Sequence, residues 1–174
     1  MKQFVLHNLE DAEKHQLALT ESAHQAQSQI EKISKIKDPL SFLEQLKFER
    51  IGCDPLDKSK PWNLIEQINQ TFTYLASFKA AALLFKWHPN MESLTLNLGT
   101  ANGTDIESQY DGGVAAEIFA ATSPSSNQKL KKDIEKVLSA TASHKYVFFI
   151  CQNIEKGYYE TKLSNEVKVW SLGK

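Results

Sequence analysis

Two carboxylates at expected strand positions carry the strongest chemical signal in this sequence. Asp105 lies in a short alternating segment, and Glu117 lies within the run from Val114 to Ala121, whose other residues are small or apolar. A carboxylate buried in such a strand is costly unless it is paired, hydrogen-bonded or bound to a cation. Mg²⁺ and Mn²⁺ favour oxygen ligands, and Mg²⁺ uses only one or two carboxylates beside water and phosphate. Two acids on neighbouring strands therefore suggest a divalent-metal site.

The turn between these two strands, over residues 111–113, decides whether the carboxylates converge. A two-residue turn pairs Asp105 with Ile118 and points it to the face opposite Glu117. A three-residue turn pairs Asp105 with Phe119 and places Asp105, Glu107 and Glu117 on one face. Both registers are open in the sequence, and so is a structural alternative in which the acids face solvent or pair with lysines.

The elements that position these acids follow from the spacing of apolar residues. Helical spacing predicts helices over residues 8–37, 40–46, 63–87 and 127–141. Alternation and one unbroken apolar run predict strands over residues 92–98, 104–110, 114–121, 146–151 and 167–170. The unbroken run belongs in the middle of the sheet, and the last strand belongs at its edge. Residues 50–62 contain turn residues and are predicted to form a loop.

This order of elements predicts an α/β fold with three layers, in which helices cover both faces of a mixed central sheet. A strand, a crossover helix and a buried strand in succession give a parallel pair, while the hairpin before them gives antiparallel strands. We expect an N-terminal helical arm over residues 1–50 and an α/β core over residues 51–174.

Composition limits the classes of protein to which the chain can belong. It has 174 residues, of which 41% are hydrophobic and 24% are charged, as expected for one globular core. Lys and Arg number 20 against 21 Asp and Glu, which argues against indiscriminate coating of nucleic acid or of an anionic membrane. Two cysteines, no signal-like apolar region and no membrane-length apolar run favour a cytoplasmic protein without a membrane partner.

Over about residues 63–151, the order helix, three strands, helix and strand, with acids at these positions, resembles the PD-(D/E)XK nuclease-like superfamily, also called restriction-endonuclease-like. In that family an acid on the first helix, an Asp on the second strand and an acid-x-Lys unit on the third hold divalent metal and orient water against a phosphodiester. The resemblance assigns these roles to Glu66, Asp105 and Glu117. It implies Mg²⁺ or Mn²⁺ as cofactor and nucleic acid as partner.

The chain departs from the family pattern at the lysine, whose position falls on Phe119. Phe119 cannot activate water, so a catalytic lysine must come from elsewhere. Some divergent members of the family look as if they place it on the following helix, where Lys129 is the first candidate here because it is nearest the helix start. An ordinary solvated helix face is the structural alternative. Glu66 has one too, because Asn63 and Glu66 have the spacing of a capping box.

The sequence therefore predicts a metal-dependent phosphodiester hydrolase, a nuclease of the PD-(D/E)XK type. Its catalytic residues would be Glu66, Asp105, Glu117 and Lys129, and the first three would hold the metal. The alternative is a catalytically inactive nuclease-like fold that acts as a nucleic-acid or protein interaction module, which Phe119 and the near-zero net charge favour. An unrelated α/β protein without a metal site is a third possibility. The N-terminal helices suit a partner helix, so we expect a homodimer through them.

Overall fold

The computed structural model of the chain describes residues 2–99 and 103–173. Contacts group the chain into two compact units. The sheet unit consists of residues 1–13 and 76–174, and the hairpin unit consists of residues 14–75. Two long helices, α1 (Leu9–Ile33) and α3 (Leu64–Trp87), each contribute residues to both units. Among the described residues, no helix combines the length and the apolar character needed to cross a bilayer.

Within its described residues, the sheet unit is built on one mixed sheet of seven strands. In the order in which they pair, these are β1 (Lys2–Leu6), β4 (Leu94–Leu98), β5 (Ile106–Ser108), β6 (Val114–Ala121), β7 (His144–Cys151), β9 (Lys168–Ser171) and β8 (Gly157–Tyr158). β7 pairs in parallel with both β6 and β9, and the other neighbouring strands are antiparallel. The predicted α/β class with a mixed sheet is confirmed.

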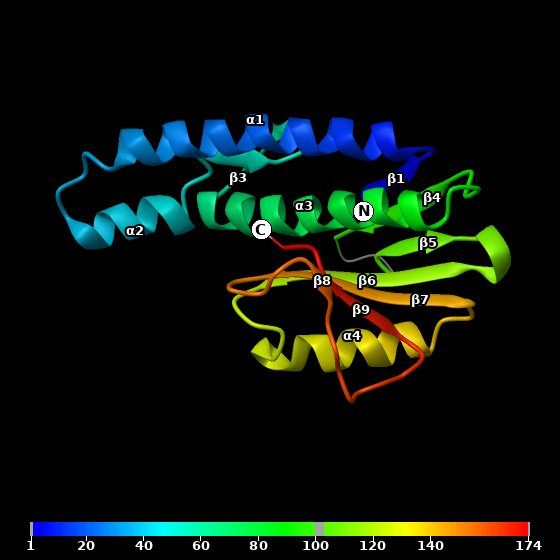
Figure 1. Cartoon of the computed structure of the whole chain (residues 1–174). Coiled ribbons are helices and arrows are strands. Elements are labelled where there is room, and N and C mark those ends of the chain that lie inside the picture. The colour runs from blue at the N-terminus through cyan, green and yellow to red at the C-terminus, as the bar shows by residue number, and fades with distance from the viewer. Residues whose placement is uncertain (1, 100–102, 174) are drawn as a thin grey trace. The chain divides into compact units, whose positions relative to one another are not determined.

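Helices cover both faces of this sheet because β7 is apolar on both of its faces. On one face, Phe148 stacks against Trp87 at the end of α3, with 5.7 Å between the ring centroids. On the other face, Phe149 packs in a cluster with Ile134 and Val137 of α4 (Lys129–Leu138). Figure 1 shows α3 and α4 on opposite sides of the strands. The central position predicted for the strand over residues 146–151 is confirmed.

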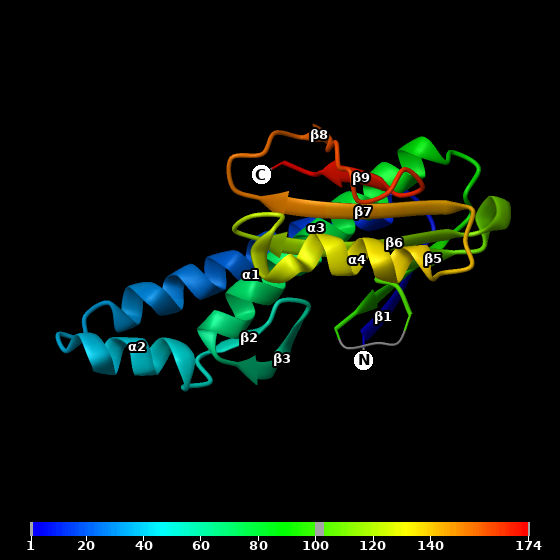
Figure 2. The same cartoon turned by 90° about the horizontal axis from the view of Figure 1, so that it is seen from below.

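The helix α4 is the crossover between the parallel strands β6 and β7. Leu130, Ile134 and Val137 are buried, and their spacing places them on one stripe of the helix. Figure 2 shows α4 lying over β6 and β7, against which it packs. The helix thereby presents the side of its buried stripe to the face of β6 that carries Glu117 and Phe119.

Two edge features of the sheet differ from the prediction. Residues 2–6 form the edge strand β1, whose partners in β4 lie 88 to 96 positions along the chain, so no local pattern identified it. The prediction that residues 167–170 form an edge strand is wrong, because β8 pairs with β9 on its outer side. β8 has only two residues, Gly157 and Tyr158, which is too short for alternation to reveal.

The connection between β5 and β6 is longer than either turn considered from the sequence. Ile106 lies opposite Ala116 and Ser108 lies opposite Val114, so residues 109–113 form the connection. It includes a 3₁₀ turn over Tyr110–Gly112. Both turn lengths predicted from the sequence are therefore wrong.

The hairpin unit contains the central part of α1, the helix α2 (Pro39–Lys47), the strands β2 (Gly52–Asp54) and β3 (Asp57–Trp62), and the start of α3. Asp38 caps α2 by accepting a hydrogen bond from the Ser41 backbone N–H at 2.8 Å, and Pro39 follows as the first helical residue. The loop predicted over residues 50–62 is wrong, because β2 and β3 form an antiparallel hairpin. Their sequence contains Asp and Lys without regular alternation, so pairing rather than pattern defines these strands.

A fully buried amide, Gln67, joins three elements of the hairpin unit. Its Oε1 accepts a hydrogen bond from the Cys53 N–H of β2 at 3.1 Å. Its Nε2 donates to the backbone oxygen of Ser22 on α1 at 3.1 Å and to the Ser22 hydroxyl at 3.0 Å. This one amide thus links β2, α1 and α3 through hydrogen bonds to buried polar groups.

Replacement of Gln67 by alanine is expected to lower the free energy of unfolding by about 3 kcal/mol, because it removes the acceptor of the buried Cys53 N–H and leaves a cavity between the three elements. Urea unfolding followed by circular dichroism measures this loss. The exposed neighbour Asn69 provides the control, since Asn69→Ala should change stability by no more than about 0.5 kcal/mol. Equal losses in the two variants would show that the buried amide has no special role.

Candidate active site

Asp105 and Glu117 lie together where β5 and β6 separate. The Asp105 backbone N–H donates to Glu117 Oε1 at 3.1 Å, and the Ile118 N–H donates to Asp105 Oδ2 at 2.8 Å. Regular pairing of the two strands ends with Ile106 opposite Ala116, and one further step of that register sets Asp105 opposite Glu117. The two carboxylates therefore converge and bridge the strands with their side chains.

The separation of the strands has a local cause on the β4 side. The Asn97 N–H donates to the Asp105 backbone oxygen at 2.8 Å, and Asn97 Nδ2 donates to the Thr104 oxygen at 2.9 Å. The backbone at Asp105 thus stays attached to β4 while β6 continues beyond it. Glu107 is not part of the acidic pair, because its Oε1 accepts the Thr104 N–H at 2.9 Å. The side chains of Asp105 and Glu117 therefore bridge β5 and β6 where the regular pairing ends.

Two lysines of α4 reach the acids on this face. Lys136 Nζ lies 2.8 Å from Glu117 Oε1, and Lys129 Nζ lies 2.7 Å from Asp133 Oδ1. Residues 129, 133 and 136 share one face of the helix, which borders its buried stripe. The Asp133 side chain is only 4% exposed, and its Oδ2 is buried without a hydrogen-bond partner in the described part of the chain. Lys136 and Asp133 were not among the predicted site residues.

The sequence did contain a signal for this pair. Residues 129, 133 and 136 repeat at steps of four and three, one position before the apolar residues Leu130, Ile134 and Val137. Charged residues that border a buried stripe are carried to the edge of the helix that meets the sheet. The position of α4 over β6, which only the tertiary structure shows, decides that Lys136 rather than Lys129 meets Glu117.

Burial and charge crowding change the protonation of the acids. Burial, and then the negative charge of Asp105, raise the pKa of Glu117 to about 7, against a partial lowering by Lys136. Burial also raises the pKa of Asp105 and the pKa of Asp133. Burial alone would lower the pKa of Lys136, but its hydrogen bond to Glu117 and the nearby carboxylates raise it above the ordinary value. Burial and mutual repulsion therefore disfavour the ionised form of three carboxylates at this site. A bound proton or a cation would reduce this repulsion.

The raised pKa of Glu117 predicts that stability depends on pH. The folded chain retains the Glu117 proton up to about pH 7, whereas the unfolded chain releases it near the ordinary value of 4.5. The contribution of Glu117 to the free energy of unfolding is complete below pH 4.5. It falls by about 3 kcal/mol as the pH rises through about 7. We expect Glu117→Gln to remove this part of the pH dependence in urea unfolding from pH 4 to pH 8. Glu135→Gln, on the exposed face of α4, should keep the wild-type slope, and an unchanged slope in Glu117→Gln would contradict the assignment.

The remaining predicted residues lie in different surroundings. Glu66 belongs to the hairpin unit, where it is exposed on the first turn of α3 and its N–H donates to Asn63 Oδ1 at 2.8 Å. The helix cap expected from Asn63 is therefore present, and the metal role of Glu66 stays a prediction. Phe119 is buried and stacks with Phe149, with ring centroids 5.5 Å apart. Phe119, which the resemblance places at a lysine position, is thus part of the core beneath α4.

The carboxylate oxygens at this site suit a hard divalent cation that needs few carboxylate ligands. Across residues 2–99 and 103–173, no group of three or more His, Cys, Asp or Glu side chains is arranged to hold a metal ion. A Mg²⁺ site does not need three, because water and substrate phosphate complete its coordination. Asp105 and Glu117 are two such carboxylates, and Asp133, whose Oδ1 pairs with Lys129 and whose Oδ2 has no hydrogen-bond partner among the described residues, is a third carboxylate near them.

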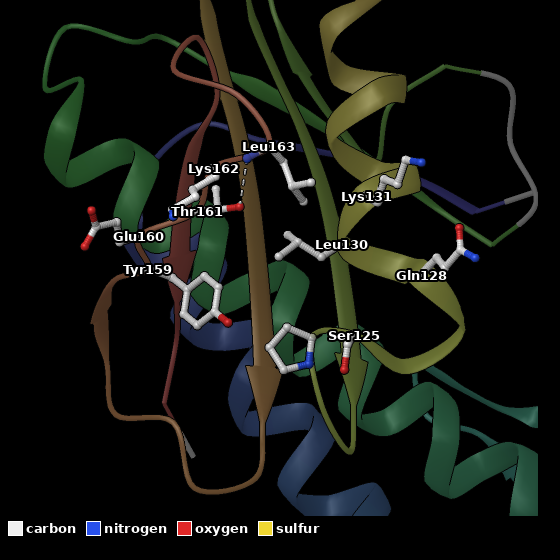
Figure 3. Close-up of a pocket in the computed structure, with 10 residues that line it drawn as sticks. Ser125, Gln128, Leu130, Lys131, Tyr159, Glu160, Thr161, Lys162 and Leu163 are labelled. Carbon is white, nitrogen blue, oxygen red and sulfur yellow. Dashed lines mark hydrogen bonds between the residues drawn. The ribbon is translucent and has the colours of Figure 1, made fainter.

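A shallow hollow of about 440 Å³ beside the start of α4 does not include these acids. Figure 3 shows Leu130, Leu163 and the Tyr159 ring turned toward one another, while Gln128 and Glu160 point away. The dashed line marks the Leu163 N–H donating to Thr161 Oγ1 at 3.2 Å. Because its polar side chains do not converge, the hollow offers no constellation for catalysis.

Comparison of the chain with protein-family models, with curated proteins and with solved structures finds no match. These comparisons therefore identify neither the PD-(D/E)XK superfamily nor any other family for this chain. The roles assigned to Asp105, Glu117 and the lysines of α4 rest on the contacts and charges described above.

Proposed function

We propose that this chain hydrolyses phosphodiester bonds with Mg²⁺ or Mn²⁺ bound at Asp105 and Glu117, as a nuclease of the PD-(D/E)XK type. The convergence of two carboxylates on neighbouring strands with a lysine 2.8 Å from one of them carries this proposal. The order α3, β4, β5, β6, α4 and β7 also repeats the helix, three strands, helix and strand of the family.

The contacts indicate which oxygens would hold the cation. Asp105 Oδ2 already accepts the Ile118 N–H, and Glu117 Oε1 already accepts the Asp105 N–H and the Lys136 ammonium. We therefore assign Asp105 Oδ1 and Glu117 Oε2 to the cation. A bound divalent cation supplies charge for a phosphoryl oxygen and a more acidic water.

Lys136 takes the role that the family gives to a strand lysine. Its ammonium neutralises Glu117 in the free protein and, with its raised pKa, stays charged at neutral pH. A fixed positive charge at this point stabilises the negative charge that develops on phosphate oxygens during hydrolysis. Lys129 acts indirectly, through Asp133, to which its ammonium donates a hydrogen bond of 2.7 Å.

Glu117 couples cation binding to proton release. With its pKa raised to about 7, part of the population carries a proton on Glu117 at neutral pH. A carboxylate that holds a divalent cation is deprotonated, so Glu117 would release this proton on holding one. The apparent affinity for Mn²⁺ should therefore increase as the pH rises from 5 to 8.

Cleavage of plasmid DNA, single-stranded DNA and RNA tests the proposal directly. The wild-type chain with Mg²⁺ or Mn²⁺ should release shorter products from at least one of these substrates, and EDTA should stop the reaction. No cleavage of any substrate with either ion would overturn the proposal. Sedimentation of the free chain tests the expected homodimer, which a nuclease acting on both strands of a duplex would require.

The inactive alternative is favoured by one specific observation. Phe119 replaces the family's lysine and is buried in the core, while the Lys136 ammonium is already paired with Glu117. A nuclease-like fold that serves as a nucleic-acid or protein interaction module would bind a partner without a metal ion and leave it intact. Binding of an oligonucleotide that is unaffected by EDTA and yields no cleavage would support this function instead.

A further inference from the structure

The first part of α3 carries apolar side chains that are open to solvent. Ile65 is 42% exposed and Phe72 is 50% exposed, and both belong to the hairpin unit. Ile68 and Leu75, in the same unit, are only partly buried. Steps of three, four and three residues place these four side chains on one side of the helix, with the spacing of a seam that packs against another helix. We call these four residues the α3 stripe.

A different side of the same helix holds the hairpin unit together. Leu64 is fully buried in a cluster with residues of α1, and Gln67 forms hydrogen bonds to α1 and β2. Successive residues of a helix turn by about 100°, which sets Phe72 about 140° and Ile65 about 160° round the helix from Gln67. The two most exposed residues of the stripe therefore point away from the side that packs on α1 and β2.

Little charge surrounds the α3 stripe. From Gln67 to Leu75 no residue is charged, in a chain of which 24% of the residues are charged. Asn69 and Thr73, which flank the stripe on its solvent side, are polar but neutral. Depletion of charge around exposed aromatic and aliphatic side chains is typical of the core of a protein interface. A partner with charged groups at this contact would bury them without a counter-charge, so the stripe complements a neutral, apolar surface.

The exposed apolar residues of α2 lie among charges instead. Leu40 is 71% exposed and Leu43 is 56% exposed. Four residues further along, where the next turn of the helix continues each of these positions, stand Glu44 and Lys47. The apolar surface of α2 is thus interrupted by charge after one turn. The α3 stripe, rather than the helices of residues 1–50 that the sequence suggested, is therefore the better surface for a neutral partner.

We propose that the α3 stripe packs against the α3 stripe of a second copy of this chain, antiparallel about a two-fold axis. The steps of three, four and three read the same in both directions, so an antiparallel copy sets Ile65 opposite the partner's Leu75. The same register sets Ile68 opposite the partner's Phe72.

Electrostatics agree with this arrangement. The dipoles of the two helices run in opposite directions, which is the favourable orientation. Glu66 is the one charged residue between Ile65 and Leu75. The two copies of Glu66 lie about 12 Å apart along the axis, beyond a Debye length of about 8 Å, so they repel each other little. One helix from each copy forms the contact, and such a small interface gives a weak dimer rather than an obligate one.

Sedimentation equilibrium of the whole chain, without metal ion or nucleic acid, tests this interface independently of the proposed hydrolysis. We expect a monomer–dimer equilibrium with a Kd of about 1–100 µM. Phe72→Lys should raise the Kd at least about tenfold, because it places a charge in the centre of the contact. Phe72 is half exposed, so the circular dichroism and the thermal midpoint of this variant should match those of the wild type.

Leu43→Lys is the matched control, since it makes the same change at an exposed apolar residue of α2 and should leave the Kd unchanged. A wild-type chain that stays monomeric at about 500 µM would overturn the proposal. So would a dimer that Leu43→Lys dissociates and Phe72→Lys does not, because that result would place the interface on α2.

A mixture of two variants tests the antiparallel register. Ile68→Glu and Phe72→Lys should each be monomeric where the wild type is a dimer. In an equimolar mixture the new carboxylate of one chain lies opposite the new ammonium of the other, while the unchanged Phe72 and Ile68 meet at the symmetry-related position. The mixture should therefore dimerise again. Ile65→Glu in place of Ile68→Glu should give no recovery, because position 65 lies opposite Leu75. A mixture that stays monomeric, or equal recovery with Ile65→Glu, would overturn this arrangement.

Discussion

Asp105→Asn is expected to lower metal-dependent hydrolysis by about a thousandfold. The substitution removes the charge that we assign to the cation, and it keeps an amide oxygen that can still accept the Ile118 N–H. The fold should therefore survive while cation binding is lost. Initial rates of cleavage with saturating Mn²⁺, together with the thermal midpoint of each chain, measure the two effects separately.

The matched control for Asp105→Asn is Glu135→Gln. It removes one negative charge from the exposed face of α4, away from Glu117, and should leave the rate within about twofold of the wild type. An Asp105→Asn chain that is folded and hydrolyses substrate at the wild-type rate would show that Asp105 does not hold the cation. Equal losses in the two variants would show that net charge, rather than position, determines the rate.

Lys136→Met is expected to lower the rate by about a hundredfold, which is the loss typical of one donor that stabilises charge in a transition state. The methionine retains the length of the side chain and removes the ammonium that lies 2.8 Å from Glu117. Without this partner the pKa of Glu117 should rise further, so the pH at which the rate is half-maximal should also move upward. Rate measurements from pH 6 to pH 9 test both effects, and a purely structural role for Lys136 would not shift the pH profile.

Substitution of two further lysines of α4 distinguishes a direct role in hydrolysis from an indirect role and from none. Lys131→Met removes a lysine whose ammonium lies 3.9 Å from the exposed Glu135, and it should leave the rate unchanged. Lys129→Met should reduce the rate by less than about tenfold, because Lys129 acts through Asp133. If Lys129→Met proves more damaging than Lys136→Met, the catalytic lysine is Lys129, as the sequence predicted.

The sequence was informative where local pattern and tertiary structure agree. The apolar run of β7 places this strand between β6 and β9, and the stripe of α4 defines the helix that covers them. The type of residue also drew attention to Asp105 and Glu117, because a charge within a strand of small and apolar residues has to be compensated. In the structure these two acids converge, as the candidate site requires.

The sequence was uninformative where long-range pairing decides the outcome. Pairing with β4 makes residues 2–6 a strand, and pairing of β2 with β3 makes a hairpin of residues predicted as a loop. The register of β5 on β6 depends on a five-residue connection that turn preferences did not identify. Which lysine meets Glu117 depends on the placement of α4 over β6, so the helix pattern offered Lys129 while the ion pair involves Lys136.

Calorimetric titration of Mn²⁺ into the wild-type chain and into Asp105→Asn tests the central claim, a cation site between β5 and β6, without a choice of substrate. At pH 8 we predict binding to the wild type with a micromolar to low millimolar Kd, weaker binding at pH 6, and no binding to the variant. Equal heats for the two chains would place the ion elsewhere. No binding to the wild type, with or without an oligonucleotide present to complete the coordination, would contradict the account.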